Sequence, residues 1–191
     1  RPHPQLGHGL WRPVAGAARS GALREVIRIA ALIALMVPIA AFSEETQWFK
    51  PKNSVVLSGV EAKKALRQCS RDSPQDVTGM WTPTTEQVHE LEARLPNALA
   101  HALDKRVLDN IRTYDIARQY SGIVIGTRKI VYVNAFELNL FNEEKRAFPN
   151  NSPSDWKHKA VNVCDGGAVF FGVEYDPKTR TFVNFAFNGG G

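Results

Sequence analysis

"RQYSGIVIGTRKIVYVNAF", residues 118–136, decides the fold of this chain, because apolar and polar residues alternate in it on both sides of a short break. Alternation with a period of two is typical of a β-strand with two different faces. The break falls at Gly126 and Thr127, and a pair of residues containing glycine can close a tight turn. The stretch therefore predicts a β-hairpin, and with it a sheet in this half of the chain.

The sequence after the hairpin extends the predicted sheet. We expect a strand at residues 161–163, a break at the glycine pair 166–167, a strand ending at Tyr175, a turn at residues 176–179, and a last strand in which Val183, Phe185 and Phe187 alternate. Glycine favours turns and bulges because it lacks a Cβ atom. Residues 137–157, rich in Asn, Pro, Ser and Glu, predict a long loop before these strands.

The sequence before the hairpin predicts helices. In "TPTTEQVHELEARLPNALAHAL", residues 82–103, leucines recur at helical spacing, Thr82 can cap the helix and Pro83 suits its first position. Pro96 has no amide proton to donate, so we expect a kink there or two helices that meet, the second running to about Tyr114.

A shorter helix is predicted over residues 58–69, where Ser58 and Glu61 stand at capping-box spacing. The turn-rich segment after it predicts an irregular link that leads to Trp81. Helices followed by antiparallel strands indicate an α+β fold, in which N-terminal helices pack on a C-terminal antiparallel sheet of four or more strands. We expect the leucine face of the longer helix to pack on a sheet face lined by Ile123, Ile125, Tyr132, Val173 and Phe185.

Residues 24–43 have the layout of a signal peptide: the basic residues Arg24 and Arg28, an uncharged run over residues 29–42, and small residues before Glu44. Fourteen residues of helix measure roughly 21 Å, whereas a hydrocarbon core measures about 30 Å. An amphipathic or buried helix is the alternative, but the run has no polar face. We therefore expect cleavage before Glu44 and no membrane span in the mature form.

The predicted domain organisation is a leader at residues 1–43, over-extended and containing the signal peptide, and a single α+β domain at 44–191. The first 25 residues are rich in Gly, Ala, Pro and Arg and lack periodicity, so we expect an over-extended reading frame whose true start, within residues 1–28, lies near Leu23 or Val26. The leader holds five arginines and one glutamate, and thus +4 of the net charge of +5. The remaining domain is nearly neutral, which argues against a nucleic-acid partner.

Cys69 and Cys164 are the only cysteines in the chain. In an exported protein two cysteines favour a disulfide over free thiols, and this one would hold the helical half against the sheet. The alternative is a catalytic thiol at Cys164 with His158 as its base. An oxidising compartment would cap such a thiol, which favours the disulfide.

The glycine pair that follows Cys164, in "VCDGGAVFFGVEYD" (residues 163–176), predicts a turn or bulge. It does not fit a phosphate-binding loop, because neither a Lys-Ser/Thr pair nor a helix follows it. The cysteines and histidines show no short paired spacing, so we expect no zinc or other metal. No cofactor is indicated.

Polar and aromatic residues beside the predicted strands form the candidate binding site. We expect Trp81, Arg118, Tyr120, Asp165 and Asn188 to gather near one edge of the sheet, as a pocket for a small ligand or a partner's loop. Arg118 and Trp81 are the foremost of these, since Arg and Trp are enriched in binding hot spots. The structural alternative is that Asp165 pairs with Arg118 while Tyr120 caps the core with its hydroxyl outward.

Five strings carry a family resemblance: "QCSRDSPQDVTGMWTP", "ARQYSGIVIG", "IVYVNAF", "VNVCDGG" and "GVEYDPKTRTF". Together they resemble a group of small uncharacterised exported proteins of Gram-negative bacteria, over roughly residues 66–188. The resemblance implies export and a core with two cysteines. It implies no activity and no functional residues.

Two classes of function remain open. A non-enzymatic binding module of the cell envelope, such as an inhibitor or immunity-type protein, would act on an envelope protein or a small ligand in the periplasm or outside the cell. A small periplasmic hydrolase would use Asp165 or Glu86 with His158 or His89. An acid and a histidine within hydrogen-bond reach in a cleft would favour the hydrolase, and an exposed apolar or aromatic patch would favour the binding module.

Overall fold

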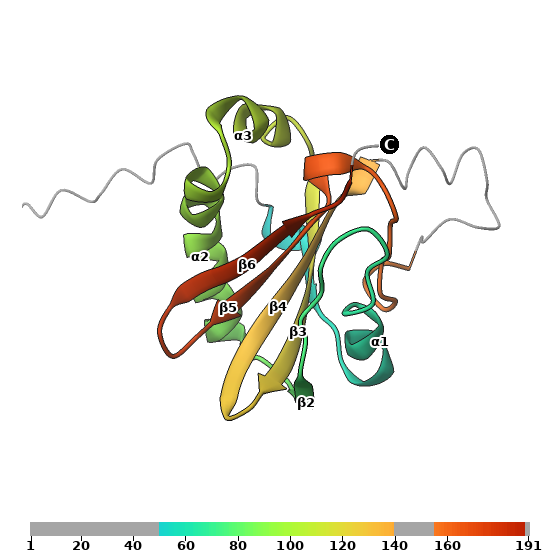
Figure 1. The fold of residues 1–191 in the computed structure, drawn as a ribbon, viewed down its shortest axis with the longest axis vertical. Coiled ribbons are helices and arrows are strands. Elements are labelled where there is room, and N and C mark those ends of the chain that lie inside the picture. Colours follow the sequence, from blue (N-terminus) through green and yellow to red (C-terminus); the bar gives the residue numbers. More distant parts are fainter. Residues whose placement is uncertain (1–49, 140–154, 190–191) are drawn as a thin grey trace, which may run out of the picture. The chain divides into compact units, whose positions relative to one another are not determined.

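A computed structural model describes residues 50–139 and 155–189 of the chain. The predicted leader, its boundary at residue 44 and most of the predicted loop lie outside these ranges. Within them the α+β fold is confirmed, with three helices and a six-stranded mixed sheet that is mostly antiparallel (Figure 1).

The sheet is built on the predicted hairpin. β3 (Ile116–Ile125) and β4 (Arg128–Glu137) pair antiparallel over their whole length. Gly126 has a φ of +60° at the first position of the two-residue turn, where a type II′ turn requires glycine. β5 (Phe171–Asp176) pairs with β4, and β6 (Thr181–Phe187) pairs with β5, both antiparallel as predicted.

Two strands that were not predicted share the other edge of β3. β1 (Ser54–Val56) runs parallel beside residues 118–120, and β2 (Val77–Trp81) runs antiparallel beside residues 122–125. β2 replaces the end of the irregular link that we expected before Trp81. Strands of three and five residues are too short to show a clear period, so only their pairing with β3 reveals them.

The leucine-rich segment forms α2 (Thr85–Ala102), which begins two residues later than predicted. Thr84, and not Thr82, is the N-cap. Its hydroxyl accepts a hydrogen bond from the amide of Gln87, and the Gln87 side chain accepts one from the amide of Thr84. This reciprocal capping box satisfies two amides that have no partner inside the helix.

Of the two outcomes predicted at Pro96, the meeting of two helices was wrong, because α2 continues through this residue to Ala102. The break comes at Leu103, and the side chain of Asp104 then accepts a hydrogen bond from the amide of Val107. Asp104 thereby starts α3 (Lys105–Ile111). A new N-cap, and not the proline, sets the boundary between the two helices.

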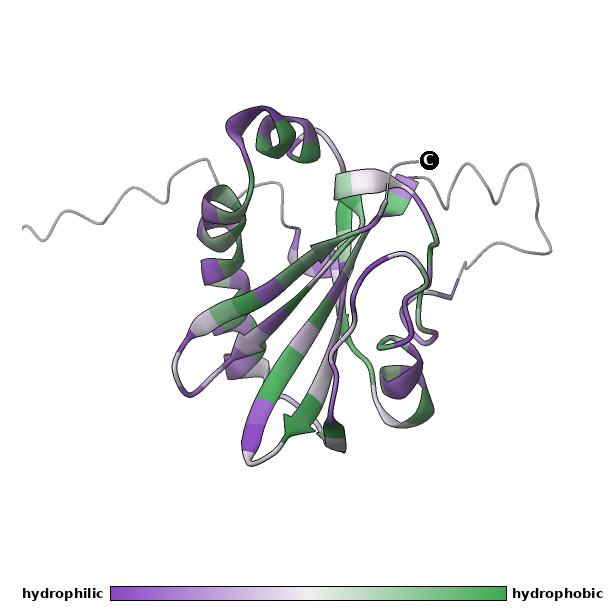
Figure 2. Ribbon diagram, in the orientation of Figure 1, coloured by the Kyte–Doolittle hydropathy of each residue, from purple (hydrophilic) through white to green (hydrophobic). Residues whose placement is uncertain are grey.

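α2 and α3 cover one face of the sheet, and their apolar sides face the strands (Figures 1 and 2). The main hydrophobic core lies in this interface. Its central residues are fully buried: Leu91, Leu95, Leu99, Ile111, Ile116, Tyr120, Val131, Val133, Phe171, Val173 and Tyr175.

Two of the five residues predicted to face the α2 leucines were correct. Val173 and Phe185 lie on this face, whereas Ile123, Ile125 and Tyr132 pack on the opposite one. Successive residues of a strand point to opposite faces. The sequence pattern alone did not show which alternate set on β3 and β4 faces the helices.

The second face is covered by α1 (Gly59–Lys64) and by irregular segments at 65–76 and 155–166. The strand predicted at residues 161–163 was wrong, because this segment belongs to the irregular layer. Two short 3₁₀ helices, η2 (Pro51–Asn53) and η3 (Gly167–Val169), complete the description.

α1 is shorter than predicted and ends before Cys69. Glu61 does not form the expected capping box with Ser58. Its carboxylate accepts hydrogen bonds from the amide of Ala160 at 2.8 Å and from Lys64 at 2.7 Å. Glu61 therefore binds the backbone of the irregular segment 155–166 and does not cap α1.

The predicted disulfide between Cys69 and Cys164 is confirmed, with their Cα atoms 5.0 Å apart. It joins the two irregular segments that cover the second face. The predicted turn after Cys164 is also confirmed, because Gly166 and Gly167 have φ values of +107° and +65°. A Cβ atom on Gly166 would collide with the ring of Phe170, so this turn requires glycine.

Replacing Cys69 or Cys164 by serine is expected to lower the free energy of unfolding by about 2–5 kcal/mol, since the bond closes a loop of 95 residues. Denaturant unfolding of the wild type and each variant measures the loss. A reductant should reproduce the effect in the wild type and leave a double-serine variant unchanged. Two reactive thiols per chain in the unfolded, unreduced protein would contradict the assignment.

Candidate functional site

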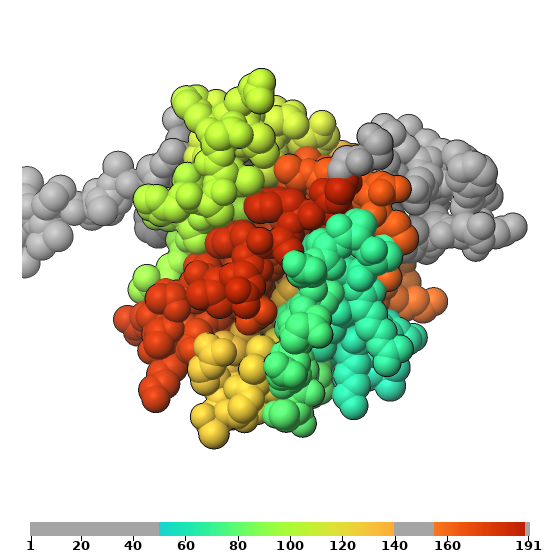
Figure 3. All heavy atoms as spheres, viewed as in Figure 1, coloured from blue at the N-terminus to red at the C-terminus, as the bar shows by residue number. Residues whose placement is uncertain are grey.

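A cleft of about 670 Å³ opens on the second face of the sheet, beside β6. Its walls come from residues 72–75, from β4 and β5, and from β6. In Figure 3, β6 (red) and the segment around residues 70–77 (green) lie on either side of the yellow end of the β3–β4 hairpin. The volume falls within the range of small-molecule sites, roughly 300–1,000 Å³. The polar lining consists of Asp72, Ser73, Gln75, Arg128, Tyr132, Glu174 and Asn184.

Glu174 of β5 is the buried acid of this cleft, with 6% of its surface exposed. Its Oε1 accepts a hydrogen bond of 3.0 Å from Nδ2 of Asn184. None of the ion pairs within residues 50–139 and 155–189 includes it. Buried carboxylates are normally matched by a cation or by several donors. Glu174 therefore keeps acceptor capacity that a donor from a ligand could use.

A bulge in β6 positions the partner of Glu174. The pairing between β5 and β6 shifts after Gly172, and Asn184 adopts a φ of +55°. Asparagine is one of the few residues that enter the left-handed region at small cost. The bulge brings the Asn184 amide to Glu174 and leaves Val183 exposed.

Tyr132 lies next to Glu174, because the two residues are register partners on β4 and β5. The Tyr132 ring is buried and crosses the backbone at Gly172, where an added Cβ atom would collide with the ring and its hydroxyl. Glycine at this position therefore leaves room for the Tyr132 ring and its hydroxyl.

Arg71 fastens the wall of the cleft to the sheet. Its Nη1 donates to Oδ1 of Asn188 at 2.6 Å, and its Nη2 donates to Oδ1 of Asn134. Asn188 in turn donates to the carbonyl oxygens of Val163 and Asp165, at 2.6 and 3.0 Å. One guanidinium thus links the two irregular segments, close to the disulfide that also joins them.

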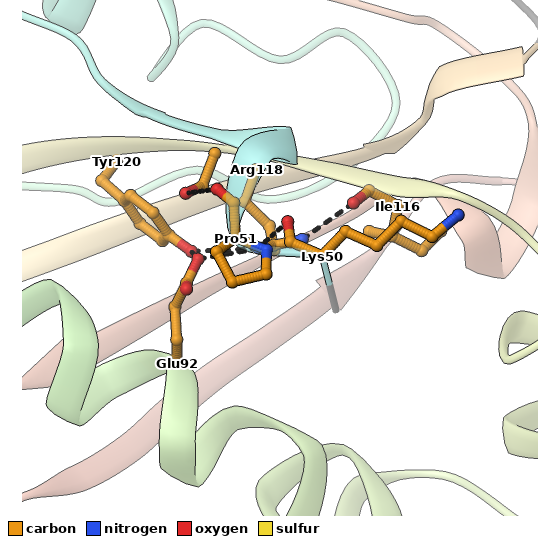
Figure 4. Close-up of polar contacts among 7 residues, drawn as sticks. Lys50, Pro51, Glu92, Ile116, Arg118 and Tyr120 are labelled. Carbon is orange, nitrogen blue, oxygen red and sulfur yellow. Dashed lines mark hydrogen bonds and ion pairs between the residues drawn. The ribbon is translucent and has the colours of Figure 1, made fainter. Parts of the chain in front are cut away.

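A second polar cluster lies on the opposite, helix-covered face, around the fully buried Arg118 (Figure 4). The Arg118 guanidinium donates to Oε1 of Glu92 at 2.8 Å and to the carbonyl oxygens of Ile116 and Lys50 at 2.8 and 3.1 Å. The Tyr120 hydroxyl donates to the same Glu92 oxygen at 2.6 Å. Every group in the cluster has a partner, so it holds the chain before β1 in place.

A pocket of about 220 Å³ adjoins this cluster, between β1 and the start of α2. His89, Glu92 and Tyr120 belong to its lining. It therefore contains an acid and a histidine, which is the combination expected of the hydrolase alternative. Oε1 of Glu92 is already bonded to Arg118 and Tyr120, which weakens Glu92 as a general base.

The five predicted binding residues do not form one pocket. Arg118 and Tyr120 lie together on the helix-covered face, whereas Asn188 bonds to Arg71 on the other face. The Asp165 side chain is exposed, and its carbonyl oxygen accepts from Asn188. Trp81 packs at the end of β2.

The individual contacts differ from the expected ones. Glu92, and not Asp165, pairs with Arg118, and the Tyr120 hydroxyl points to Glu92 and not outward. Trp81 Nε1 donates to the carbonyl oxygens of Ile123 and Ile130, at 3.0 and 3.2 Å. The acid that pairs with a buried arginine is the one that the fold places next to it, and the sequence alone does not show which acid that is.

Neither predicted acid, Asp165 or Glu86, lines a cleft of the described part of the chain, although His89 lines the smaller pocket. His158 contacts Asp155, three residues earlier on an exposed turn, and not Asp165. Glu86 and His89 lie one turn apart on α2. The exposed apolar patch expected of a binding module also differs: in the described part of the chain, the exposed large hydrophobic residues are Val60 and Val183.

Sequence reasoning missed three residues that organise these sites: Arg71, Glu92 and Glu174. Glu174 carried a signal, since it is the only charged residue between apolar neighbours in "FFGVEYD". Glu92 borders the leucine stripe of α2, where a charged residue can reach the sheet. Arg71 lies in an aperiodic segment and carried no signal.

Metal ligands, membrane spans and known relatives do not identify the site further. In the described ranges no group of three or more His, Cys, Asp or Glu side chains could hold a metal ion. None of the helices described has the length and hydropathy that crossing a membrane requires. Comparisons with protein-family models, with curated proteins and with solved structures give no match.

Replacing Glu92 by glutamine is expected to lower the free energy of unfolding by about 3 kcal/mol, because it removes the negative charge of Glu92 from the buried ion pair with Arg118. Glu90→Gln is the matched control on the same helix, since Glu90 pairs with Arg94 and Arg180 at the surface. The control should lose less than about 1 kcal/mol. Urea unfolding measures the free energy of unfolding of both variants. Equal losses in the two would contradict the assignment of Glu92 and Arg118 as a buried ion pair.

Burial raises the pKa of Tyr120, and the nearby Glu92 carboxylate adds to this while Arg118 opposes it. In the unfolded chain the Tyr120 hydroxyl loses its proton near pH 10, whereas in the folded protein it keeps the proton. The contribution of Tyr120 to the free energy of unfolding is therefore complete below pH 10 and falls as the pH rises above 10. Above pH 10 the free energy of unfolding of the wild type should fall by about 1.4 kcal/mol per pH unit more than that of Tyr120→Phe. Urea unfolding from pH 9 to 11 measures the two slopes, and parallel slopes would refute the assignment.

Proposed function

We propose that this protein is an exported binding module, not an enzyme, and that it holds a small polar ligand in the cleft beside β6. The observation that carries the proposal is Glu174, a buried acid with one amide donor that lines a cleft of about 670 Å³. Small-molecule sites are typically concave, with a few polar groups fixed in orientation on a rigid frame. Glu174 on its strand meets this description.

The rigidity of the cleft supports the proposal. Tyr132 is fixed against Gly172, and Arg71 fixes the wall through Asn134 and Asn188. The disulfide joins the segments behind that wall. Groups already held in position lose little conformational entropy when a ligand binds, which favours affinity.

Two features support a periplasmic or extracellular location. The disulfide between Cys69 and Cys164 fits an oxidising compartment. Residues 24–43 have the order of charges, apolar run and small residues that is typical of a signal peptide. The ligand would accordingly be a molecule of the envelope or its surroundings.

A small hydrolase is the second candidate, and the pocket of about 220 Å³ that His89 lines with Glu92 is the observation in its favour. Hydrolysis of 4-nitrophenyl acetate that disappears in His89→Ala would support it. The engagement of Glu92 by Arg118 and Tyr120 favours the binding module instead.

A ligand panel tests the binding module. Tri-alanine, spermidine, citrate and N-acetylglucosamine represent zwitterionic, cationic, anionic and neutral polar chemistry, and calorimetric titration of the purified protein measures their binding. Gln75→Trp places a large ring at the exposed wall of the cleft and should abolish binding. Asn97→Trp, on the exposed side of α2, is the matched control and should not change it.

At least one panel member is expected to bind and to lose its affinity at least tenfold in the cleft variant but not in the control. Equal affinities in both variants would place the ligand elsewhere. Absence of binding by all four probes would contradict the proposed function.

A further inference from the structure

The cleft presents two opposite charges without ion-pair partners in the described part of the chain. Glu174 lines it as a buried side chain, and Arg128, at the start of β4, lines it as an exposed one. The ion pairs between described residues include neither of them. The two side chains line one cleft but do not pair with each other.

The strand register gives their separation. Glu174 lies opposite Tyr132, and Arg128 precedes Tyr132 by four residues on β4. At about 3.3 Å per residue their positions are roughly 13 Å apart along the sheet. Residues 128 and 132 are on the same face, since side chains alternate along a strand. Both side chains extend from the backbone, so the carboxylate of Glu174 and the guanidinium of Arg128 can come closer than their backbone positions. The remaining distance suits a short extended molecule.

Other charged residues line the cleft and the pocket that shares Arg128 with it. Asp72 is the other acid of the cleft lining. At the other end, Arg128 also lines an adjoining pocket of about 430 Å³ with Lys129 and Lys178. The acid of that pocket, Asp176, accepts hydrogen bonds from the turn amides of Lys178 and Thr179, at 2.8 and 3.3 Å. The side chains that line this second pocket are therefore predominantly basic, although Lys129 lies over the Trp81 ring and outside the cleft itself.

We infer that the cleft binds a short zwitterion, of which a free di- or tripeptide is the simplest example, with its ammonium group on Glu174 and its carboxylate on Arg128. This inference rests on the proposed binding function. An ammonium group supplies three donors to a carboxylate, and a guanidinium binds a carboxylate with two parallel hydrogen bonds. An extended tripeptide spans about 10 Å, which fits the separation of the charges.

The apolar part of the lining fits the middle of such a molecule. Pro74, Ile125, Ala186 and part of Phe185, whose ring packs toward the helix-covered core, make up the apolar lining of the cleft. They favour small apolar side chains over charged ones. A purely anionic ligand would place its charge near Glu174, and a purely cationic one would meet Arg128, so the two charges select against both.

Three peptides test the inference in the unaltered protein: tri-alanine, N-acetyl-tri-alanine, which lacks the ammonium group, and tri-alanine amide, which lacks the carboxylate. Calorimetric titration should show that each block weakens binding about tenfold or more, because each removes a charge-assisted hydrogen bond. Equal affinity for all three peptides would overturn the inference.

Variants assign each end of the peptide. For Glu174→Gln, the affinities for tri-alanine and N-acetyl-tri-alanine should agree within a factor of two. For Arg128→Gln, the affinities for tri-alanine and tri-alanine amide should agree in the same way. The charge-matched controls Glu86→Gln and Arg106→Gln, both exposed on helices of the other face, should keep both preferences. A preference for the free ammonium that survives in Glu174→Gln would overturn the assignment.

The panel separates the two proposals. If citrate, spermidine or N-acetylglucosamine binds in a manner that Gln75→Trp abolishes while tri-alanine does not bind, the zwitterion is wrong and the binding function stands. If none of the probes binds, both proposals fail.

Discussion

Burial of β3 on both faces is the constraint on which the rest of this structure depends. Eight successive residues, 116–123, are buried, so neither face of the central strand reaches water. Antiparallel sheets commonly leave one face solvated. Here the protein must supply two covering layers, and it makes them differently: regular helices on one face, and mostly irregular chain on the other.

An irregular layer over a sheet has to satisfy its own backbone, because buried amide and carbonyl groups need partners. Gln119 and Asn134 perform this task from the sheet. The Gln119 amide donates to the carbonyl oxygens of Trp156 and Lys159, and its oxygen accepts from the amide of Val161. Asn134 donates to the Val161 carbonyl oxygen and to Gln119. Side-chain amides thus replace the ladder of a neighbouring strand, and the layer ends where the cleft begins.

The sequence predicted what depends on local pattern. The hairpin of residues 116–137 and the leucine helix were predictable because periodic burial leaves a periodic sequence, and the disulfide because Cys69 had one possible partner. The strands β1 and β2, the orientation of the sheet faces and the partner of Arg118 depend on contacts distant in sequence. Glu174 escaped notice for a related reason: a single charged residue in a strand is normally a solvent-facing one, and only the second layer makes it buried.

The bulge at Asn184 also bears on how this protein meets other chains. A straight edge strand offers a continuous row of amide and carbonyl groups onto which a second polypeptide can add as a further strand. The left-handed residue near the middle of β6 interrupts that row after three residues, so neither half is long enough to template a foreign strand. Edge-to-edge aggregation is thereby discouraged at high local concentration. The side chains of β6 are then what this edge presents to another molecule, and side-chain chemistry distinguishes one molecule from another in a way that backbone pairing does not.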